Sequence, residues 1–239
     1  MLTLSSWFNR VRIPEPEVID RKEEIAAYIS STTQSYLERI DQTFVEQALS
    51  LGILEGNALD VGTGPGQIPI KLAAKAPGLY LTGVDLSSSM IARAKKTAEQ
   101  AGLANQICFQ LGDAKCLPFG DHSFDMVLCN SLLHHTADPL ETLNELSRVC
   151  MPQGAVLLRD LRRPSRFLFP FHAWWFGRHY LGLMNQLYLQ SLSASYTQDE
   201  LEELLLHSHL SDAQVFQTGQ THIGIQRVAK LAYIQAPKL

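Results

Sequence analysis

The 239-residue chain has few of the features that mark disulfide-rich, zinc-binding or nucleic-acid-binding proteins. Its four cysteines form no C-x-x-C pair, which argues against both a disulfide framework and a structural zinc site, so we predict no metal. The formal net charge is −4, and a basic face of the kind that binds nucleic acid is not expected.

Long hydrophobic runs are also missing from the sequence. No stretch reaches about 20 uninterrupted apolar residues, which argues against a transmembrane helix. The N-terminus lacks a basic segment followed by an apolar one, so we expect no signal peptide. Hydrophobic residues still make up 46% of the chain, enough for a sizeable core. We therefore expect one cytoplasmic domain.

Strand and helix patterns alternate from residue 57 onward. Helices are expected from about residue 67 and over 87–102 and 138–150, and this alternation predicts an α/β fold with a parallel sheet. The strands are expected at 57–61, 80–85, 107–113, 124–130 and 154–161.

The two ends of the chain add further elements. Residues 1–17 are expected to form an irregular arm because Pro14 and Pro16 bar a helix, and helices are expected at 18–31 and 34–51. Near the C-terminus, a T-x-x-E capping box opens a predicted helix at 197–210, and a hairpin over 213–229 follows.

The glycine-rich stretch LDVGTGPGQ (59–67) predicts a turn that passes close to a ligand. A triphosphate-binding loop requires Gly-Lys-Ser/Thr, which this sequence lacks, so the turn is not predicted to bind a nucleoside triphosphate. Gln67 stands where the dinucleotide fingerprint needs its third glycine. Asp60 would repel a pyrophosphate, but it suits a ligand that carries an ammonium and a sulfonium group.

Polar residues also follow the next three predicted strands. Asp85 ends the second strand, where a carboxylate can accept hydrogen bonds from both ribose hydroxyls of a nucleotide-like ligand. Asp113 follows the third strand and can accept from an adenine amino group, and Asn130 ends the fourth. The Asp85 contact is common to dinucleotide and S-adenosylmethionine sites, so this residue alone does not separate them.

Taken together, LDVGTGPGQ, GVDLSSSMI (83–91), GDAKCLPF (112–119), FDMVLCNSLLHH (124–135) and RVCMPQGAVLLRDL (148–161) resemble the class I S-adenosylmethionine-dependent methyltransferases. The resemblance implies a Rossmann-like, doubly wound, seven-stranded mixed sheet in the order 3-2-1-4-5-7-6, with strand 7 antiparallel and helices on both faces. It implies S-adenosylmethionine as the cofactor. The cofactor-binding residues that it implies are Asp60, Gly62, Thr63, Gly64, Asp85, Leu86, Met90, Gly112, Asp113, Ala114 and Asn130.

The acceptor is expected beyond the carboxyl ends of the fourth and fifth strands. His134, His135 and Tyr28 are candidates to remove a proton from a nucleophile. Candidates to bind the substrate are Arg162 and Arg163, which would clamp an anion, and Trp174 and Trp175 of the aromatic segment 166–192. That segment is expected to roof an apolar pocket, and a dimer interface or a membrane contact are alternatives.

These observations predict a single methyltransferase domain. Its parts are an N-terminal helical arm (1–52), a cofactor-binding core (53–161), an aromatic helical insertion (162–196) and a closing helix and hairpin (197–239). The predicted activity is methyl transfer to a small molecule, apolar and with an anionic group, by in-line displacement. The alternatives are a non-catalytic S-adenosylmethionine-binding subunit and a nicotinamide-dependent oxidoreductase, and a homodimer is left open.

Overall fold

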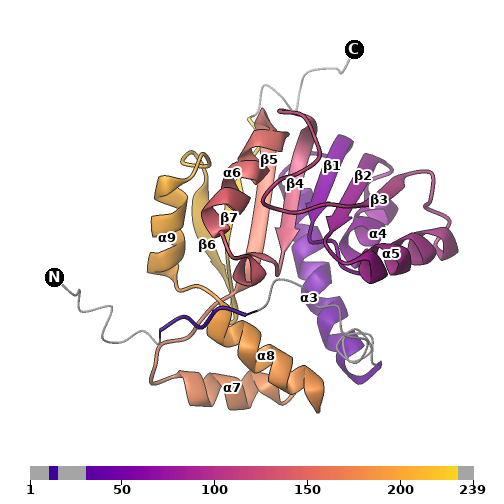
Figure 1. The fold of residues 1–239 in the computed structure, drawn as a ribbon. Coiled ribbons are helices and arrows are strands. Elements are labelled where there is room, and N and C mark those ends of the chain that lie inside the picture. Colours follow the sequence, from indigo (N-terminus) through magenta and orange to yellow (C-terminus); the bar gives the residue numbers. More distant parts are fainter. Residues whose placement is uncertain (1–10, 16–30, 231–239) are drawn as a thin grey trace.

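The computed structural model describes residues 11–15 and 31–230 of the chain (Figure 1). Seven strands of this part form one mixed sheet in the order β3-β2-β1-β4-β5-β7-β6, which confirms the predicted topology. The strands are β1 Glu55–Val61, β2 Gly78–Asp85, β3 Ile107–Leu111, β4 Phe124–Asn130, β5 Cys150–Leu161, β6 Gln214–Thr218 and β7 His222–Arg227.

Strand β1 lies in the middle of the parallel part of the sheet. It pairs in parallel with β2 on one side and β4 on the other, so that Asp60 lies opposite Gly83 and Leu128. Strand β5 continues the parallel order beside β4, whereas β7 runs antiparallel to both β5 and β6, as predicted. The carboxyl ends of β1, β2, β4 and β5 therefore meet at one edge.

Helices cover both faces of the sheet (Figure 1). Local capping explains where several of them begin: the side chain of Ser87 accepts from the backbone N–H of Met90, and Thr197 and Glu200 form the predicted capping box. The helices are α3 Ser31–Ser50, α4 Gln67–Lys75, α5 Ser88–Gln100, α6 Pro139–Val149, α7 Phe169–Gly177, α8 Leu183–Ala194 and α9 Gln198–His207, with the 3₁₀ turn η1 Leu133–His135.

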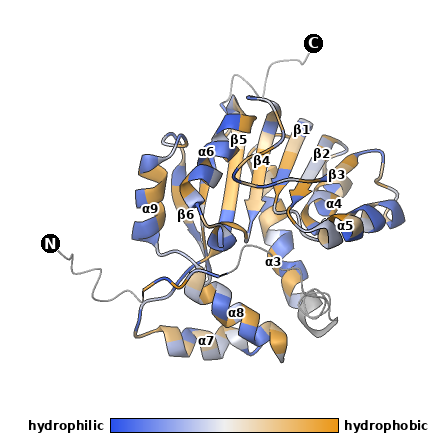
Figure 2. Cartoon of the chain, viewed as in Figure 1, coloured by the Kyte–Doolittle hydropathy of each residue, from blue (hydrophilic) through white to orange (hydrophobic). Residues whose placement is uncertain are grey.

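Alternation along β4 divides the core between the two faces. Met126 and Leu128 join the cluster that packs under α3, α4 and α5, whereas Val127 and Cys129 join the cluster under α6 and α9. The central strands β4 and β5 are accordingly apolar along most of their length, and the polar residues of α5, α6 and α9 face outward (Figure 2). Burial on both faces is typical of parallel sheets.

The insertion after β5 folds as the two helices α7 and α8, which lie together beyond the carboxyl edge of the sheet (Figure 1). A third apolar cluster joins Tyr180, Met184 and Tyr188 to Tyr36 and Leu37 of α3. The insertion is thereby attached to the core at the edge where the predicted ligand site lies. Within the described residues, no helix combines the length and apolar character needed to cross a membrane.

Several predicted boundaries differ from the observed ones. Strand β5 begins at Cys150 rather than at residue 154, because Cys150 still pairs with Phe124 across a register shift in β4. Strand β3 ends at Leu111, two residues early, and α9 ends at His207. Most of the helix predicted at 18–31 lies outside the described residues.

Substitution of Gly224 in β7 provides a test of the β5–β7 pairing. A Cβ added to Gly224 would lie 2.1 Å from the backbone oxygen of Leu158 and 2.6 Å from the Phe216 ring. Because backbone cannot yield without breaking this pairing, we expect Gly224→Ala to lower the free energy of unfolding by about 3 kcal/mol or more in urea titrations. Gly120→Ala is the control, with its nearest neighbour at 3.6 Å and an expected change within about 0.5 kcal/mol. Equal stability of the two variants would contradict the register.

Candidate functional site

The turn between β1 and α4 carries three glycines with left-handed backbone. Their φ angles are 74° at Gly62, 52° at Gly64 and 82° at Gly66. A Cβ at Gly62 would press on Leu132, whereas one at Gly64 would meet nothing within 4 Å. The turn therefore packs closely at its start and leaves open space above Gly64, where a ligand can approach the backbone.

Asp60 lies near the end of β1 with only 2% of its surface exposed. Its Oδ2 and the neighbouring Oγ1 of Thr63 are buried and have no hydrogen-bond partner among the described residues. Burial raises the pKa of Asp60 to about 7. The nearby Thr63 side chain opposes this rise, and the carboxylates of Asp41 and Asp85 add to it. An unpaired acid in such a position favours a cationic ligand.

Asp85 links the glycine turn to the loop before α5. Its Oδ2 accepts from the backbone N–H of Gly64 at 2.8 Å, and its Oδ1 accepts from that of Ser87 at 2.9 Å. These two contacts hold the carboxylate at the edge of the cavities.

Three adjoining cavities surround these groups and share Gly62 among their lining residues. Their volumes are about 100, 190 and 40 Å³. The first contacts Asp60 and Thr63, the second extends from Asp85 to α8, and the third contacts Asp113. All eleven residues expected to bind the cofactor line one or more of these cavities, which the structure therefore brings together.

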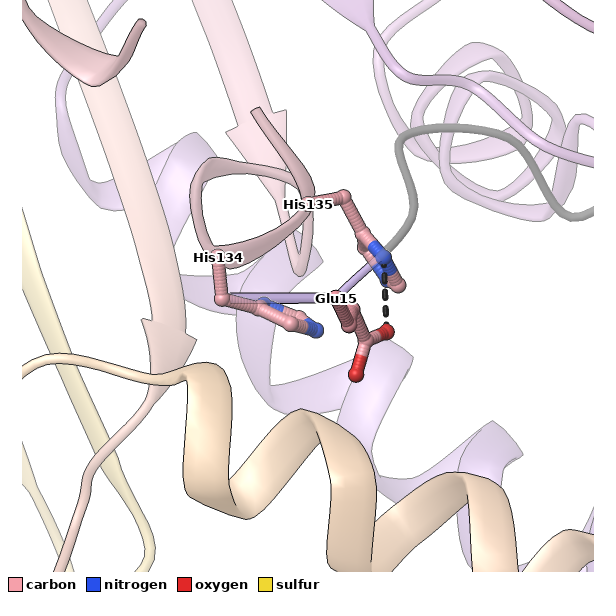
Figure 3. A group of neighbouring side chains, drawn as sticks. All are labelled: Glu15, His134 and His135. Carbon is pink, nitrogen blue, oxygen red and sulfur yellow. Dashed lines mark ion pairs between the residues drawn. The ribbon is translucent and has the colours of Figure 1, made fainter. Parts of the chain in front are cut away.

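The two histidines of η1 line the 190 Å³ cavity. His134 is 2% exposed, and its Nδ1 lies 2.5 Å from Oδ1 of Asp160 at the end of β5. Burial lowers the pKa of His134, but Asp160 outweighs this effect and the net direction is upward. Nδ1 of His135 lies 2.7 Å from Oε1 of Glu15, which comes from the N-terminal segment (Figure 3).

A buried arginine that the sequence did not single out holds the end of β4. The guanidinium of Arg159 donates to the side-chain oxygen of Asn130 at 3.2 Å, to Thr43 at 2.8 Å and to the carbonyl of Ile40 at 2.9 Å. Burial lowers the pKa of Arg159 to about 10. Arg159 thus fixes Asn130 against α3 at the edge of the first cavity.

The expectation that Arg162 and Arg163 clamp a substrate is not supported by where they lie. The guanidinium of Arg163 is buried, donates to the carbonyl of Ser195 at 2.5 Å and pairs with Glu200 of α9. Arg162 donates to Gln217 at 2.8 Å. Neither arginine lines any of the three cavities, because both side chains tie the insertion to the closing helix and hairpin.

Trp174 and Trp175, which were also expected to bind the substrate, lie outside the lining of the three cavities. Both lie on α7 with 65% and 40% of their surfaces exposed, away from the cavity lining, and Arg178 covers the Trp175 ring at 4.0 Å. Helix α8 lines the cavity instead. Tyr28 lies outside the described residues. The residues that sequence reasoning missed are Glu15, Asp160, Tyr180, Met184, Leu187 and Tyr188.

Comparison with known proteins decides the family. Residues 59–158 match the family model described as a methyltransferase domain. A demethylmenaquinone methyltransferase of Roseiflexus castenholzii is 31% identical over 187 residues, which cover 72% of this chain and 76% of that protein. The chain belongs to the class I S-adenosylmethionine-dependent methyltransferases.

Other relatives of this methyltransferase are matched over shorter stretches. A ubiquinone/menaquinone biosynthesis C-methyltransferase of Geotalea daltonii is 31% identical over 48% of this chain and 49% of its own length. The chain spans about half the length, or less, of several of the curated relatives that it matches. A solved methyltransferase structure from Aquifex aeolicus shares the fold, with a TM-score of 0.61 at 19% identity over 85% of this chain and 96% of that one.

The family cofactor, S-adenosylmethionine, fits the groups present in this methyltransferase. The orphaned Oδ2 of Asp60 and Oγ1 of Thr63 offer partners to an ammonium group. Open space above Gly64 admits the methionine part, and the carboxylate of Asp85 lines the adjoining cavity, where it would accept from ribose hydroxyls. These residues would hold the cofactor.

The raised pKa of Asp60 leads to a stability test. Between its ordinary value of 3.8 and about 7, the folded state keeps a proton that the unfolded chain has released, so stability falls as pH rises through this range. In Asp60→Asn this loss is absent. Without cofactor, we expect the unfolding free energy of Asp60→Asn, measured relative to that of the parent protein, to rise by about 2 kcal/mol from pH 5 to pH 8.

Urea titrations at the two pH values measure this difference, and Asp199→Asn on the exposed start of α9 is the control. A difference between Asp60→Asn and the parent protein that stays constant with pH would show that Asp60 titrates normally.

Proposed function

We propose that this protein transfers a methyl group from S-adenosylmethionine to a small molecule bound between the loop after β4 and helix α8. The observation that carries the proposal is the 190 Å³ cavity, whose wall runs without interruption from Gly64 and Asp85 to His134 and Tyr188. Such a cavity places a donor and an acceptor side by side. Proximity of this kind accounts for a large part of the rate of a displacement reaction.

The cofactor end of the cavity is assigned by charge and by hydrogen-bonding capacity. Asp60 would pair with the ammonium group, Asp85 would accept from the ribose hydroxyls, and Leu86 and Met90 would flank the adenine. Asp113 and Ala114 line the neighbouring small cavity and would bind the adenine edge. When bound, S-adenosylmethionine supplies an activated methyl group on a sulfonium.

The acceptor end is mostly apolar. Tyr180, Met184, Leu187 and Tyr188 of the insertion face the cavity and would exclude water from the sulfonium. With Arg162 and Arg163 directed elsewhere, an anionic acceptor loses the counter-charge that we expected for it. We therefore propose an apolar acceptor whose reacting hydroxyl, amine or thiol lies near the histidines.

The acceptor atom would attack the methyl carbon of the bound cofactor from the side opposite sulfur, with the electron pair of the carbon–sulfur bond left on sulfur and S-adenosylhomocysteine as the product. The proton of the reacting hydroxyl, amine or thiol would pass to His134 or His135, which line the acceptor end. The residues of this chain bind, orient and desolvate the two reactants. A homodimer and a cytoplasmic location remain predictions.

The cofactor assignment predicts a loss of affinity in Asp85→Asn. An amide oxygen and an NH₂ group cannot accept from two ribose hydroxyls, and a hydrogen bond to a charged group contributes about 1.5–3 kcal/mol. We expect calorimetric titration to show about 10-fold or more weaker binding of S-adenosylmethionine and S-adenosylhomocysteine. Asp199→Asn is the matched control and should bind as the parent protein does. Binding of NAD in place of both sulfur compounds would refute the assignment.

The acceptor assignment predicts that filling the cavity blocks turnover but not cofactor binding. Leu187→Trp introduces an indole into the α8 wall of the cavity, whereas Leu206→Trp adds the same group to the exposed side of α9. Turnover is measured as S-adenosylhomocysteine formed with a panel of substituted phenols, anilines and thiols. We expect at least about a 10-fold loss in the first variant only. Cofactor binding without turnover in the parent protein would favour the non-catalytic alternative.

A further inference from the structure

Glu15, His134 and His135 form a cluster of metal-ligand types within the described residues. One side-chain donor atom from each lies within 4.8 Å of the other two. Figure 3 shows the Glu15 carboxylate beside both imidazole rings, whose centroids are 4.1 Å apart. The three residues come from two segments separated by about 120 positions in the chain, so their meeting is a product of the fold.

Three buried atoms of this cluster have no hydrogen-bond partner in the described part of the chain. They are Nε2 of His134, on a ring that is 98% buried, Nδ1 of His135 and Oε2 of Glu15. A buried polar atom without a partner costs free energy, and orphaned atoms at a native site require a ligand or another explanation. A cation between the three residues would give these atoms a partner.

Asp160 sets the orientation of the His134 ring. Its Oδ1 lies 2.5 Å from Nδ1 of His134, and its Oδ2 accepts from the backbone N–H of the same residue at 2.9 Å. In the neutral imidazole that binds a metal, an acceptor at Nδ1 places the ring proton there and leaves the lone pair on Nε2, the unpartnered nitrogen of the ring. A carboxylate behind a histidine in this way is a recurring support of metal-bound imidazole.

The segment that carries Glu15 is fastened to the end of α8. Arg12 donates to the carbonyl of Ala194 at 2.6 Å and to that of His134 at 3.1 Å. The backbone N–H of Ile13 donates to the carbonyl of Ser193 at 3.0 Å, and the Ser191 hydroxyl donates to Glu15 at 3.2 Å. Glu15 is therefore held at the histidines by Ser191 and by the contacts of Arg12 and Ile13.

We infer that Glu15, His134 and His135 bind one divalent transition-metal ion, of which zinc fits the ligand set best. The ion would keep one coordination position open to the 190 Å³ cavity. Two imidazoles and one carboxylate with an open fourth position are the ligand set of catalytic zinc sites. Two nitrogen donors disfavour magnesium and calcium, which prefer oxygen. Ligand atoms around a tetrahedral zinc ion lie about 3.3 Å apart. Ligand atoms that are now up to 4.8 Å apart need to draw together, whereas Nδ1 of His135 and Oε1 of Glu15, 2.7 Å apart, would separate slightly if both bind the ion.

The use of this ion rests on the proposed function. His134 and His135 line the acceptor end of the cavity, so an acceptor hydroxyl or thiol would reach the open position. A bound cation lowers the pKa of such a group, and its proton leaves to solvent before the displacement. Under this inference the histidines act as ligands rather than as free proton acceptors, and it departs from the prediction of no metal, which rested on the spacing of the cysteines alone.

Zinc and cobalt binding test the inference directly. Protein freed of metal by a chelator is titrated with Zn²⁺ by calorimetry and with Co²⁺ by visible absorption. We expect one equivalent bound, and affinities weaker by about 10-fold or more in Glu15→Gln and His135→Asn. Glu203→Gln and His209→Asn, on the exposed surface of α9 and of the loop after it, are matched controls. His134 is fully buried, so the two partly buried ligands carry the test.

The same samples are titrated with S-adenosylmethionine, so the two proposals can fail separately. One equivalent of metal with loss in the two ligand variants, but not in the controls, would support the site even if cofactor binding were absent. No binding of either ion, or equal binding in all variants, would overturn it while leaving a measured cofactor affinity intact. Unchanged thermal midpoints verify that the variants are folded.

Discussion

The parallel pairing of β1 with both β2 and β4 is the constraint on which the site depends. It places the ends of three strands, with Asp60, Asp85 and Asn130, at one edge of the sheet. A slip of one residue in β1 would turn Asp60 to the opposite face and expose an apolar neighbour to the cavity. The apolar residues on both faces of these strands fix the register, so the same burial that stabilises the sheet also positions the carboxylates.

The cofactor end of the site could be predicted from sequence because its residues are local to strand ends. The glycine turn and Asp85 each follow a strand closely, and the topology alone brings them together. The acceptor end could not be predicted so well. Arg162 and Arg163 are adjacent and chemically alike in the sequence, but Glu200, 37 positions beyond Arg163, decides that the latter is buried. Likewise, α7 carries apolar residues around its whole circumference, so its sequence does not indicate which side faces the cavity. It therefore could not be predicted whether the tryptophans of α7 or the side chains of α8 line the cavity.

Asp60 illustrates the cost of preparing a site for a cation. A buried carboxyl whose pKa is raised to about 7 destabilises the protein at neutral pH, and no hydrogen bond in the described residues satisfies its Oδ2. Asn130 shows the opposite arrangement at the same edge, because Arg159 holds its side-chain oxygen. The fold therefore leaves unpaired the group that faces the ligand's charge and pairs the group that only needs to stay in place.

The balance of charge around the cavities restricts the acceptor more than their shape does. Asp60, Asp85 and Glu15 all lie at or beside the cavities. Arg159, Arg163 and Arg12 are directed to α3, to α9 and to the end of α8, so the cationic residues left in the cavity lining, Arg93 and Lys115, belong to the first and third cavities and not to the acceptor end. Acidic surroundings stabilise a sulfonium and an ammonium and repel an anionic acceptor. A cation held by Glu15 and the two histidines would reverse this preference only at the acceptor end. An ionised oxygen or sulfur could then approach the methyl group, and without the ion a neutral nucleophile is the acceptor that these charges permit.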